Sequence, residues 1–138
     1  MSKLILDHIG IVVNNIEKTA NFFSKAIGID LQEIEDYKQI LKIGFLPVES
    51  IDIELLEPTS TNGINAEFLK NHGEGVHHIA FEVENLDQAI KTAVDQGAKV
   101  IFGPTEGARG KKIVFLDGDM FGGTIIELLE SNQPSHTP

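Results

Sequence analysis

The chain of 138 residues contains no cysteine. This absence excludes disulfide bonds, thiolate nucleophiles and sulfur ligands to a metal. Any metal ion would therefore be held by nitrogen and oxygen donors alone. Because a chain without disulfides is typical of the cytoplasm, we expect a cytoplasmic location.

Positive charge is scarce: 11 lysines and arginines stand against 21 aspartates and glutamates, a formal net charge of −10. A protein that binds nucleic acid needs a basic surface, so we expect no nucleic-acid partner. The same charge repels anionic small molecules. An anionic substrate would therefore need a local positive centre, and a bound divalent cation is the obvious candidate.

Long hydrophobic runs are missing as well, because no apolar stretch approaches the roughly 18 to 20 residues that cross a membrane. The N-terminus also lacks the charged and apolar leader of a secreted chain. We therefore expect no membrane partner and a mature chain that matches this sequence. The 41% of hydrophobic residues is enough for a packed core, and the length suits a single domain.

The chain contains an internal repeat in which two histidines hold matching places. Residues 7–16 read DHIGIVVNNI and residues 77–86 read HHIAFEVENL. His8 and His78 are therefore 70 positions apart.

A segment with helical periodicity follows each histidine block, at residues 17–26 and 87–96. A glycine follows each segment, Gly28 in the first half and Gly97 in the second. Both glycines stand where a left-handed helix end is expected. The spacing thus predicts two helices at equivalent places.

The two halves also end alike, because residues 51–57 read IDIELLE and residues 124–130 read TIIELLE. Glu54 and Glu127 hold the same place in these endings. Each ending has the alternation of a β-strand, with the glutamate between two apolar residues.

Each half therefore predicts one strand, one helix and three further strands, with β-rich runs at residues 40–46 and 112–116. We expect an α+β fold in which two βαβββ modules are related by an approximate two-fold axis around an open cleft. A single domain would span residues 1–138. Its parts are expected at about 3–58 for module one, 59–75 for a connector with a helical patch at 66–70, 76–130 for module two and 131–138 for a flexible tail.

Two histidines and two glutamates recur at matching places: His8, Glu54, His78 and Glu127. Each glutamate either faces solvent from a half-buried strand or points inward, where it must be paired or bound to a metal. A set of two histidines and two carboxylates suits a divalent ion with positions left open for substrate. By ligand type, Zn, Co, Ni, Mn and Fe are all admissible.

Several motifs resemble the vicinal oxygen chelate superfamily, whose members are built from paired βαβββ modules. The stretch FLKNHGEGVHHIAFEV at residues 68–83 most resembles the methylmalonyl-CoA epimerases, as do residues 7–13, 53–58, 107–116 and 122–128. The resemblance covers nearly the whole chain. It implies one divalent metal ion, a homodimer, and four ligands, with His77 as a neighbour of the site. The implied ligands are His8, Glu54, His78 and Glu127.

The resemblance also implies a reaction at the carbon next to a thioester. A metal that holds the thioester and carboxylate oxygens stabilises the enolate that forms when the α-proton leaves. Glu127 matches the family's base, and Glu54 could serve the opposite face. Some epimerases carry another acid on the strand corresponding to residues 39–46, where this chain has none.

Candidate residues for holding the thioester substrate lie elsewhere in the chain. Arg109, Lys111 and Lys112 form a dense basic cluster in a glycine-rich loop. Such a cluster could hold the anionic groups of coenzyme A, although three cations can also be simply solvated. Gln39 is a further candidate for substrate binding.

Three other functions are compatible with the motifs. A glyoxalase I would use the same four ligands on the hemithioacetal of a thiol and methylglyoxal. A protein of the bleomycin-resistance type would bind its ligand without a metal and without catalysis. An extradiol dioxygenase fits less well, because it uses two histidines and one carboxylate on iron, and Glu54 offers a fourth ligand.

Overall fold

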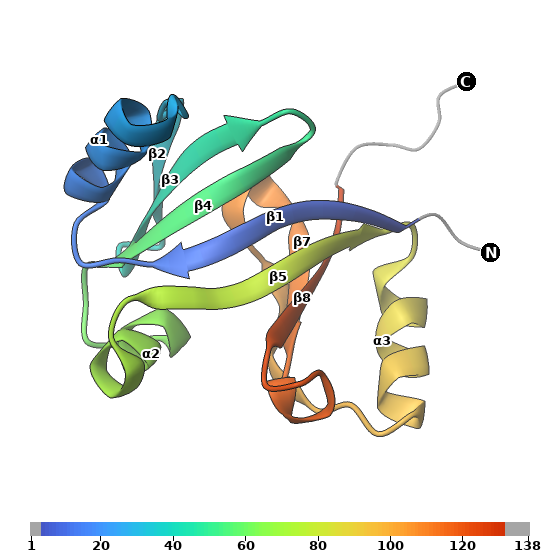
Figure 1. Ribbon diagram of the computed structural model, residues 1–138. Helices are drawn as coiled ribbons and strands as arrows, with labels where there is room; N and C mark the ends of the chain where they lie inside the picture. The colour runs from blue at the N-terminus through green and yellow to red at the C-terminus, as the bar shows by residue number, and fades with distance from the viewer. Residues whose placement is uncertain (1–3, 132–138) are drawn as a thin grey trace. The chain divides into compact units, whose positions relative to one another are not determined.

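The computed structural model describes residues 4–131, so residue 3 of the expected first module and residues 132–138 of the expected tail lie outside the described part. The chain separates into two compact units (Figure 1). Residues 7–79 form what we call the N-terminal unit. The described part of the C-terminal unit consists of residues 80–131 together with residues 4–6.

The N-terminal unit contains two helices and a sheet with the strand order β2-β3-β4-β1. Strand β1 runs parallel to β4, and the other neighbours are antiparallel. The elements are β1 (Leu4–Val12), α1 (Ile16–Ile27), β2 (Glu33–Tyr37), β3 (Leu41–Val48), β4 (Ile51–Pro58) and α2 (Ile64–His72).

The core of the N-terminal unit lies between α1 and strands β3 and β4 (Figure 1). Ile16 and Ala20 of α1 pack there against Leu46 and Leu55 of the strands. Burial of this apolar face is what holds the amphipathic helix on the sheet.

The C-terminal unit repeats this order, with strands β8-β7-β6 antiparallel and α3 in contact with β7 and β8. Strand β5 begins in the N-terminal unit and ends here. The elements are β5 (Gly75–Val83), α3 (Leu86–Asp95), β6 (Val100–Glu106), η1 (Ala108–Gly110), β7 (Lys112–Leu116), η2 (Gly118–Met120) and β8 (Ile125–Glu130). The predicted α+β class with two βαβββ modules is confirmed. In the described residues 4–131, no helix is long and apolar enough to cross a membrane.

Both predicted helices are present within one residue of their expected bounds, and each begins at an asparagine whose side chain caps it. Asn15 accepts a hydrogen bond from the Lys18 amide, at 2.8 Å. Gly28 ends α1 in the left-handed conformation, as predicted. Gly97 likewise follows α3 with a positive φ of 109°, directly after Gln96, and the Ala98 amide donates a hydrogen bond back to the Ala93 carbonyl at 3.0 Å.

A glutamate at the end of the last strand binds the first helical amide in each unit. Glu57 accepts a hydrogen bond from the Ile16 amide at 2.8 Å, and Glu130 accepts one from the Leu86 amide at 2.6 Å. A carboxylate at a helix N-terminus satisfies a free N–H group and interacts favourably with the helix dipole. The repeat seen in the sequence is therefore a repeat of specific contacts.

Candidate metal centre

The register of β1 and β4 places a histidine and a glutamate on one face of the N-terminal sheet. His8 pairs with Asp52 and Gly10 pairs with Glu54. Side chains two residues apart on a strand share a face, and so do register partners on adjacent strands. Along β1, positions 8, 10 and 12 are buried and the residues between them are less so. His8 and Glu54 thus project from the buried face.

Both repeated glutamates are buried, so neither is a solvated strand residue. Glu54 is 6% exposed and Glu127 is 5% exposed. Each lies opposite a buried phenylalanine of the preceding strand, Phe45 for Glu54 and Phe115 for Glu127. A carboxylate in such surroundings needs a cation or hydrogen-bond donors to offset its lost hydration.

The His8 ring lies between two carboxylates and a second imidazole. Its Nδ1 atom is 2.7 Å from Asp7 Oδ2 and 3.1 Å from Glu54 Oε2. Because ionised carboxylates only accept hydrogen bonds, we assign a proton to this Nδ1 atom. Its Nε2 atom is 3.1 Å from Nε2 of His78.

The separation of these two Nε2 atoms suits a pair of ligands to one ion. Two nitrogens about 2.1 Å from a shared ion lie about 3.0 Å apart at a right angle and about 3.4 Å apart at the tetrahedral angle. The observed 3.1 Å between His8 and His78 falls within that interval. Asp7, His8 and Glu54 also form a group whose candidate ligand atoms lie within 4.8 Å of one another. The donors are nitrogen and oxygen, and they fit a divalent transition metal.

Gly10 is a residue of this site that the sequence reasoning missed. A Cβ atom at this position would lie 2.4 Å from Cε1, 2.7 Å from Nε2 and 2.9 Å from Nδ1 of His78. The His78 ring therefore rests against the bare backbone of β1. The sequence signal for this contact is a small residue two positions after each repeated histidine, Gly10 in the first repeat and Ala80 in the second.

The basic cluster lies in the C-terminal unit and is partly paired with acids. Lys112 Nζ is 3.2 Å from Asp87, and Lys111 Nζ is 3.9 Å from Glu82. Arg109 is exposed and has a φ of 59°. A pocket of about 380 Å³ borders this loop; its lining consists of Pro104, Thr105, Glu106, Gly110 and Lys112.

Gln39, the remaining candidate, lies in the exposed turn between β2 and β3. Its φ is 61°, and its backbone amide donates a hydrogen bond to the Asp36 carboxylate at 3.0 Å. The structure thus gives Gln39 a local role in closing the hairpin.

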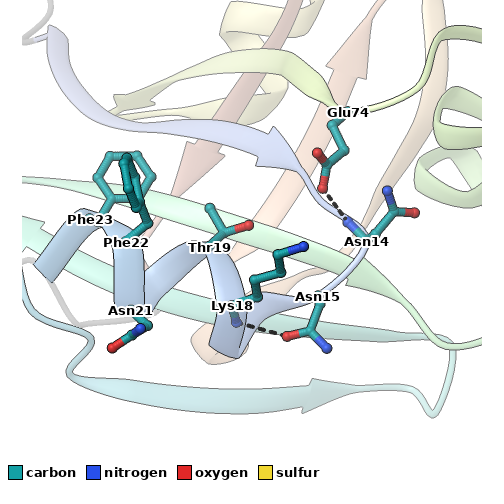
Figure 2. A pocket seen from close by; sticks show the side chains of 8 residues that line it. All are labelled: Asn14, Asn15, Lys18, Thr19, Asn21, Phe22, Phe23 and Glu74. Carbon is teal, nitrogen blue, oxygen red and sulfur yellow. Dashed lines mark hydrogen bonds between the residues drawn. The ribbon is translucent and has the colours of Figure 1, made fainter. Parts of the chain in front are cut away.

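A pocket of about 470 Å³ lies beside the start of α1 (Figure 2). Its lining contains none of the predicted site residues; it consists of Asn14, Asn15, Lys18, Thr19, Asn21, Phe22, Phe23 and Glu74. Figure 2 shows Glu74 accepting a hydrogen bond from the Asn14 amide, at 2.8 Å. This bond ties the segment before β5 to the link between β1 and α1, and so helps to place the strand that carries His78.

Comparison with known proteins identifies the family of the chain. The family model of the glyoxalase/bleomycin resistance protein/dioxygenase superfamily matches residues 7–115. The chain belongs to this superfamily, which confirms the resemblance drawn from the motifs.

Several relatives are similar over nearly the full length. The uncharacterised protein YqjC of Bacillus subtilis is 33% identical, over 95% of each chain. The ethylmalonyl-CoA/methylmalonyl-CoA epimerase of Cereibacter sphaeroides is 32% identical, over 89% of this chain and 95% of the relative. The methylmalonyl-CoA epimerase of Streptomyces coelicolor, solved with 2-nitronate-propionyl-CoA, superposes with a TM-score of 0.86 at 28% identity, over 95% of this chain and all of the other.

Proposed function

We propose that the protein is a metal-dependent isomerase that epimerises methylmalonyl-CoA or a related acyl-CoA. The observation that carries this proposal is the buried pair of imidazoles, His8 and His78, with Nε2 atoms 3.1 Å apart and the Glu54 carboxylate beside His8. The relatives named as methylmalonyl-CoA epimerases support the choice of substrate.

The proposed ligands are His8, Glu54, His78 and Glu127. The first three come from the N-terminal unit, where the 3.1 Å between Nε2 of His8 and Nε2 of His78 supports a shared ion. Glu54 is included for its buried place beside the His8 ring, where its Oε2 atom lies 3.1 Å from Nδ1. Glu127 is included because it holds the place in the second repeat that Glu54 holds in the first, opposite a buried phenylalanine. The ion is one of the divalent metals that accept nitrogen and oxygen donors, Co, Ni, Zn, Mn or Fe.

In the proposed reaction one carboxylate takes the α-proton from one face and a second carboxyl group gives a proton to the other face. When bound, the ion supplies the positive charge that makes the α-proton acidic enough to remove. Glu127 accepts that proton as the α-carbon–hydrogen bond breaks, and the electron pair of this bond passes to the thioester oxygen. Glu54 must carry a proton when this substrate is bound; it delivers that proton to the opposite face of the α-carbon, which inverts the centre and leaves Glu54 ionised and Glu127 protonated. Burial of both carboxylates excludes competing water.

The rest of the proposal concerns the substrate and the assembly. Arg109, Lys111 and Lys112 would hold the anionic groups of coenzyme A, and Gln39 would contact the substrate from its turn. The chain would form one domain across residues 1–138 and assemble as a homodimer in the cytoplasm. Sedimentation equilibrium of the purified protein measures the assembly, and a monomer would refute that part.

Turnover of two substrates, measured side by side, tests the activity. The chelator-treated protein is supplied with Co²⁺, Ni²⁺, Zn²⁺ or Mn²⁺ and given one epimer of methylmalonyl-CoA or the hemithioacetal of methylglyoxal. We expect epimerisation that needs the metal and is abolished in His78→Ala. Turnover of the hemithioacetal alone would identify a lyase of the glyoxalase I type, which a buried Glu54 also suits. Stoichiometric ligand binding without turnover or metal would identify a sequestering protein of the bleomycin-resistance type.

A further inference from the structure

We propose that His77 is a positioning residue, which fixes the ring of His78 so that His78 Nε2 faces His8 Nε2. Its Nδ1 atom lies 2.8 Å from Nδ1 of His78, within hydrogen-bond distance. His77 is only 3% exposed, so its ring is held inside the protein. The proposal rests on the proposed metal function, because it concerns how one metal ligand is oriented.

The direction of the hydrogen bond follows from the chemistry of a ligating imidazole. A nitrogen that binds a metal carries no proton, so a neutral His78 that binds through Nε2 has its proton on Nδ1. That Nδ1–H group donates to His77 Nδ1, and His77 then carries its own proton on Nε2. A hydrogen bond to the second nitrogen of a ligating histidine fixes its tautomer and the orientation of its ring.

Helix α2 holds His77 in place. The Phe68 ring meets the His77 ring edge to face, with centroids 5.0 Å apart and planes at 82°. The Phe68 ring also stacks with the ring of His72, and the two centroids are 4.7 Å apart. Residues 59–75, which join the two repeats, thus include a helix that braces the second histidine block.

The two repeats use the same device with different chemistry. In each, the residue directly before the histidine lies beside its Nδ1 atom: Asp7 beside His8 at 2.7 Å, and His77 beside His78 at 2.8 Å. Asp7 is a charged acceptor. The neutral imidazole of His77, in contrast, adds no negative charge to those of the Asp7 and Glu54 carboxylates. His77 can therefore orient a ligand without adding to the repulsion between carboxylates.

Three variants separate positioning from packing. His77→Phe keeps a ring against Phe68 but removes the nitrogen acceptor. His77→Asn keeps an amide oxygen near the place of Nδ1 and so restores an acceptor. His72→Phe is the matched control, because it also changes a histidine in contact with Phe68, but an exposed one.

The first measurement is Zn²⁺ affinity by competition with a chelator, for variants whose circular dichroism matches the parent. We expect His77→Phe to lose about 10- to 100-fold, the range seen when partners of ligating histidines are removed. His77→Asn should stay within about threefold of the parent, and His72→Phe should not change the affinity. A folded His77→Phe with parental affinity would overturn the proposal, and so would His77→Asn as weak as His77→Phe.

The second measurement is the imidazole ¹⁵N spectrum of the Zn²⁺-loaded protein, which reports which ring nitrogen of His78 binds the ion and which carries the proton. The loaded protein is used because, without the ion, a proton on Nε2 of His78 can bridge to Nε2 of His8, 3.1 Å away. We expect a bound Nε2 and a protonated Nδ1 on His78 in the parent and in His77→Asn, and a mixture of binding modes in His77→Phe. A parental His78 bound through Nδ1 would overturn the proposal, even if His77→Phe failed to fold. Failure of the parent to bind any divalent ion would instead refute the proposed function.

Discussion

The two repeats agree in their buried parts and differ at their edges. Strands β3 and β4 are joined by two residues, whereas β7 and β8 are joined by the eight residues 117–124. Strands β2 and β3 pair in unbroken register, whereas the pairing of β6 with β7 shifts twice. Yet both repeats place a buried glutamate opposite a phenylalanine. Contacts that fix the buried carboxylates are thus shared, while the connections are free to vary.

A second comparison concerns the residue before each histidine. The first repeat uses Asp7 at this place and the second uses His77. Both lie next to a ring nitrogen, but only Asp7 can bring a negative charge. The repeats therefore share the position of the residue beside each Nδ1 atom, but only the first repeat places a carboxylate there.

The largest expected effect comes from removing either repeated histidine. His8→Ala and His78→Ala should each reduce Zn²⁺ affinity by more than about 100-fold, beyond the losses caused by changing a ligand's partner. Equilibrium dialysis with zinc analysis measures this. Parental affinity in either variant would show that the two repeats do not contribute equivalent ligands.

Gly10 and Ala80 hold equivalent places after the two histidines. Gly10→Ala would press a methyl group on the His78 ring, and we expect a loss of about 1 to 3 kcal/mol in the free energy of unfolding. It should also weaken Zn²⁺ binding, because the ring must move. Urea denaturation measures the first effect and chelator competition the second.

Ala80→Gly is the matched change in the second repeat. It should cost about 1 kcal/mol, from strand flexibility and a lost methyl group. It should leave Zn²⁺ affinity within about twofold, because removing the Ala80 methyl group pushes no atom against the ring of a metal ligand. If Gly10→Ala also left the affinity unchanged, the close approach of His78 to β1 would have no part in metal binding.

The helix contacts of the two repeats should be equal in strength. Glu57→Ala and Glu130→Ala each leave a buried helical amide without its carboxylate acceptor, at an expected cost of about 1 to 2 kcal/mol. The two losses should agree within about 0.5 kcal/mol if the repeats are equivalent in this respect. Chemical denaturation of the two variants measures both, and a loss in one variant alone would break the equivalence.

The smallest expected effect lies in the basic cluster, of which Lys112 has a counterpart in the first repeat, Lys42, while the places of Arg109 and Lys111 are held there by Gln39 and Leu41. Arg109→Gln and Lys111→Gln should each raise KM for the acyl-CoA about two- to fivefold, as expected for exposed charge pairs. Zn²⁺ affinity should not change. A KM that is insensitive to both changes, and to salt, would show that the loop does not hold the substrate.

Much of the fold followed from the sequence, because its signals are local or repeated. The helices α1 and α3 were predicted from periodicity and from glycines at their ends, and both are confirmed. Gly28 and Gly97 both have a positive φ after these helices, as the pattern predicts. The matched endings also identified Glu54 and Glu127 as a pair, although burial had to come from the structure.

The surroundings of the site could not be predicted, because they depend on contacts between distant segments. The need for glycine at position 10 arises from a ring 68 positions later in the chain. The brace on His77 comes from Phe68 on α2, whose side chain no periodicity assigns to a partner. The histidines and glutamates that recur at matching places in the sequence indicate metal chemistry. The orientation of each ring is set by the residues that pack against it in the folded protein.

Deuterium exchange at the α-carbon of methylmalonyl-CoA tests the central claim most directly. The thioester is incubated in D₂O with the metal-loaded protein, and the α-proton is followed by NMR. The account predicts rapid loss of the α-proton signal, together with formation of the other epimer, and no loss with chelator-treated protein or His78→Ala. An α-proton signal that persists in the presence of folded, metal-loaded protein would contradict it.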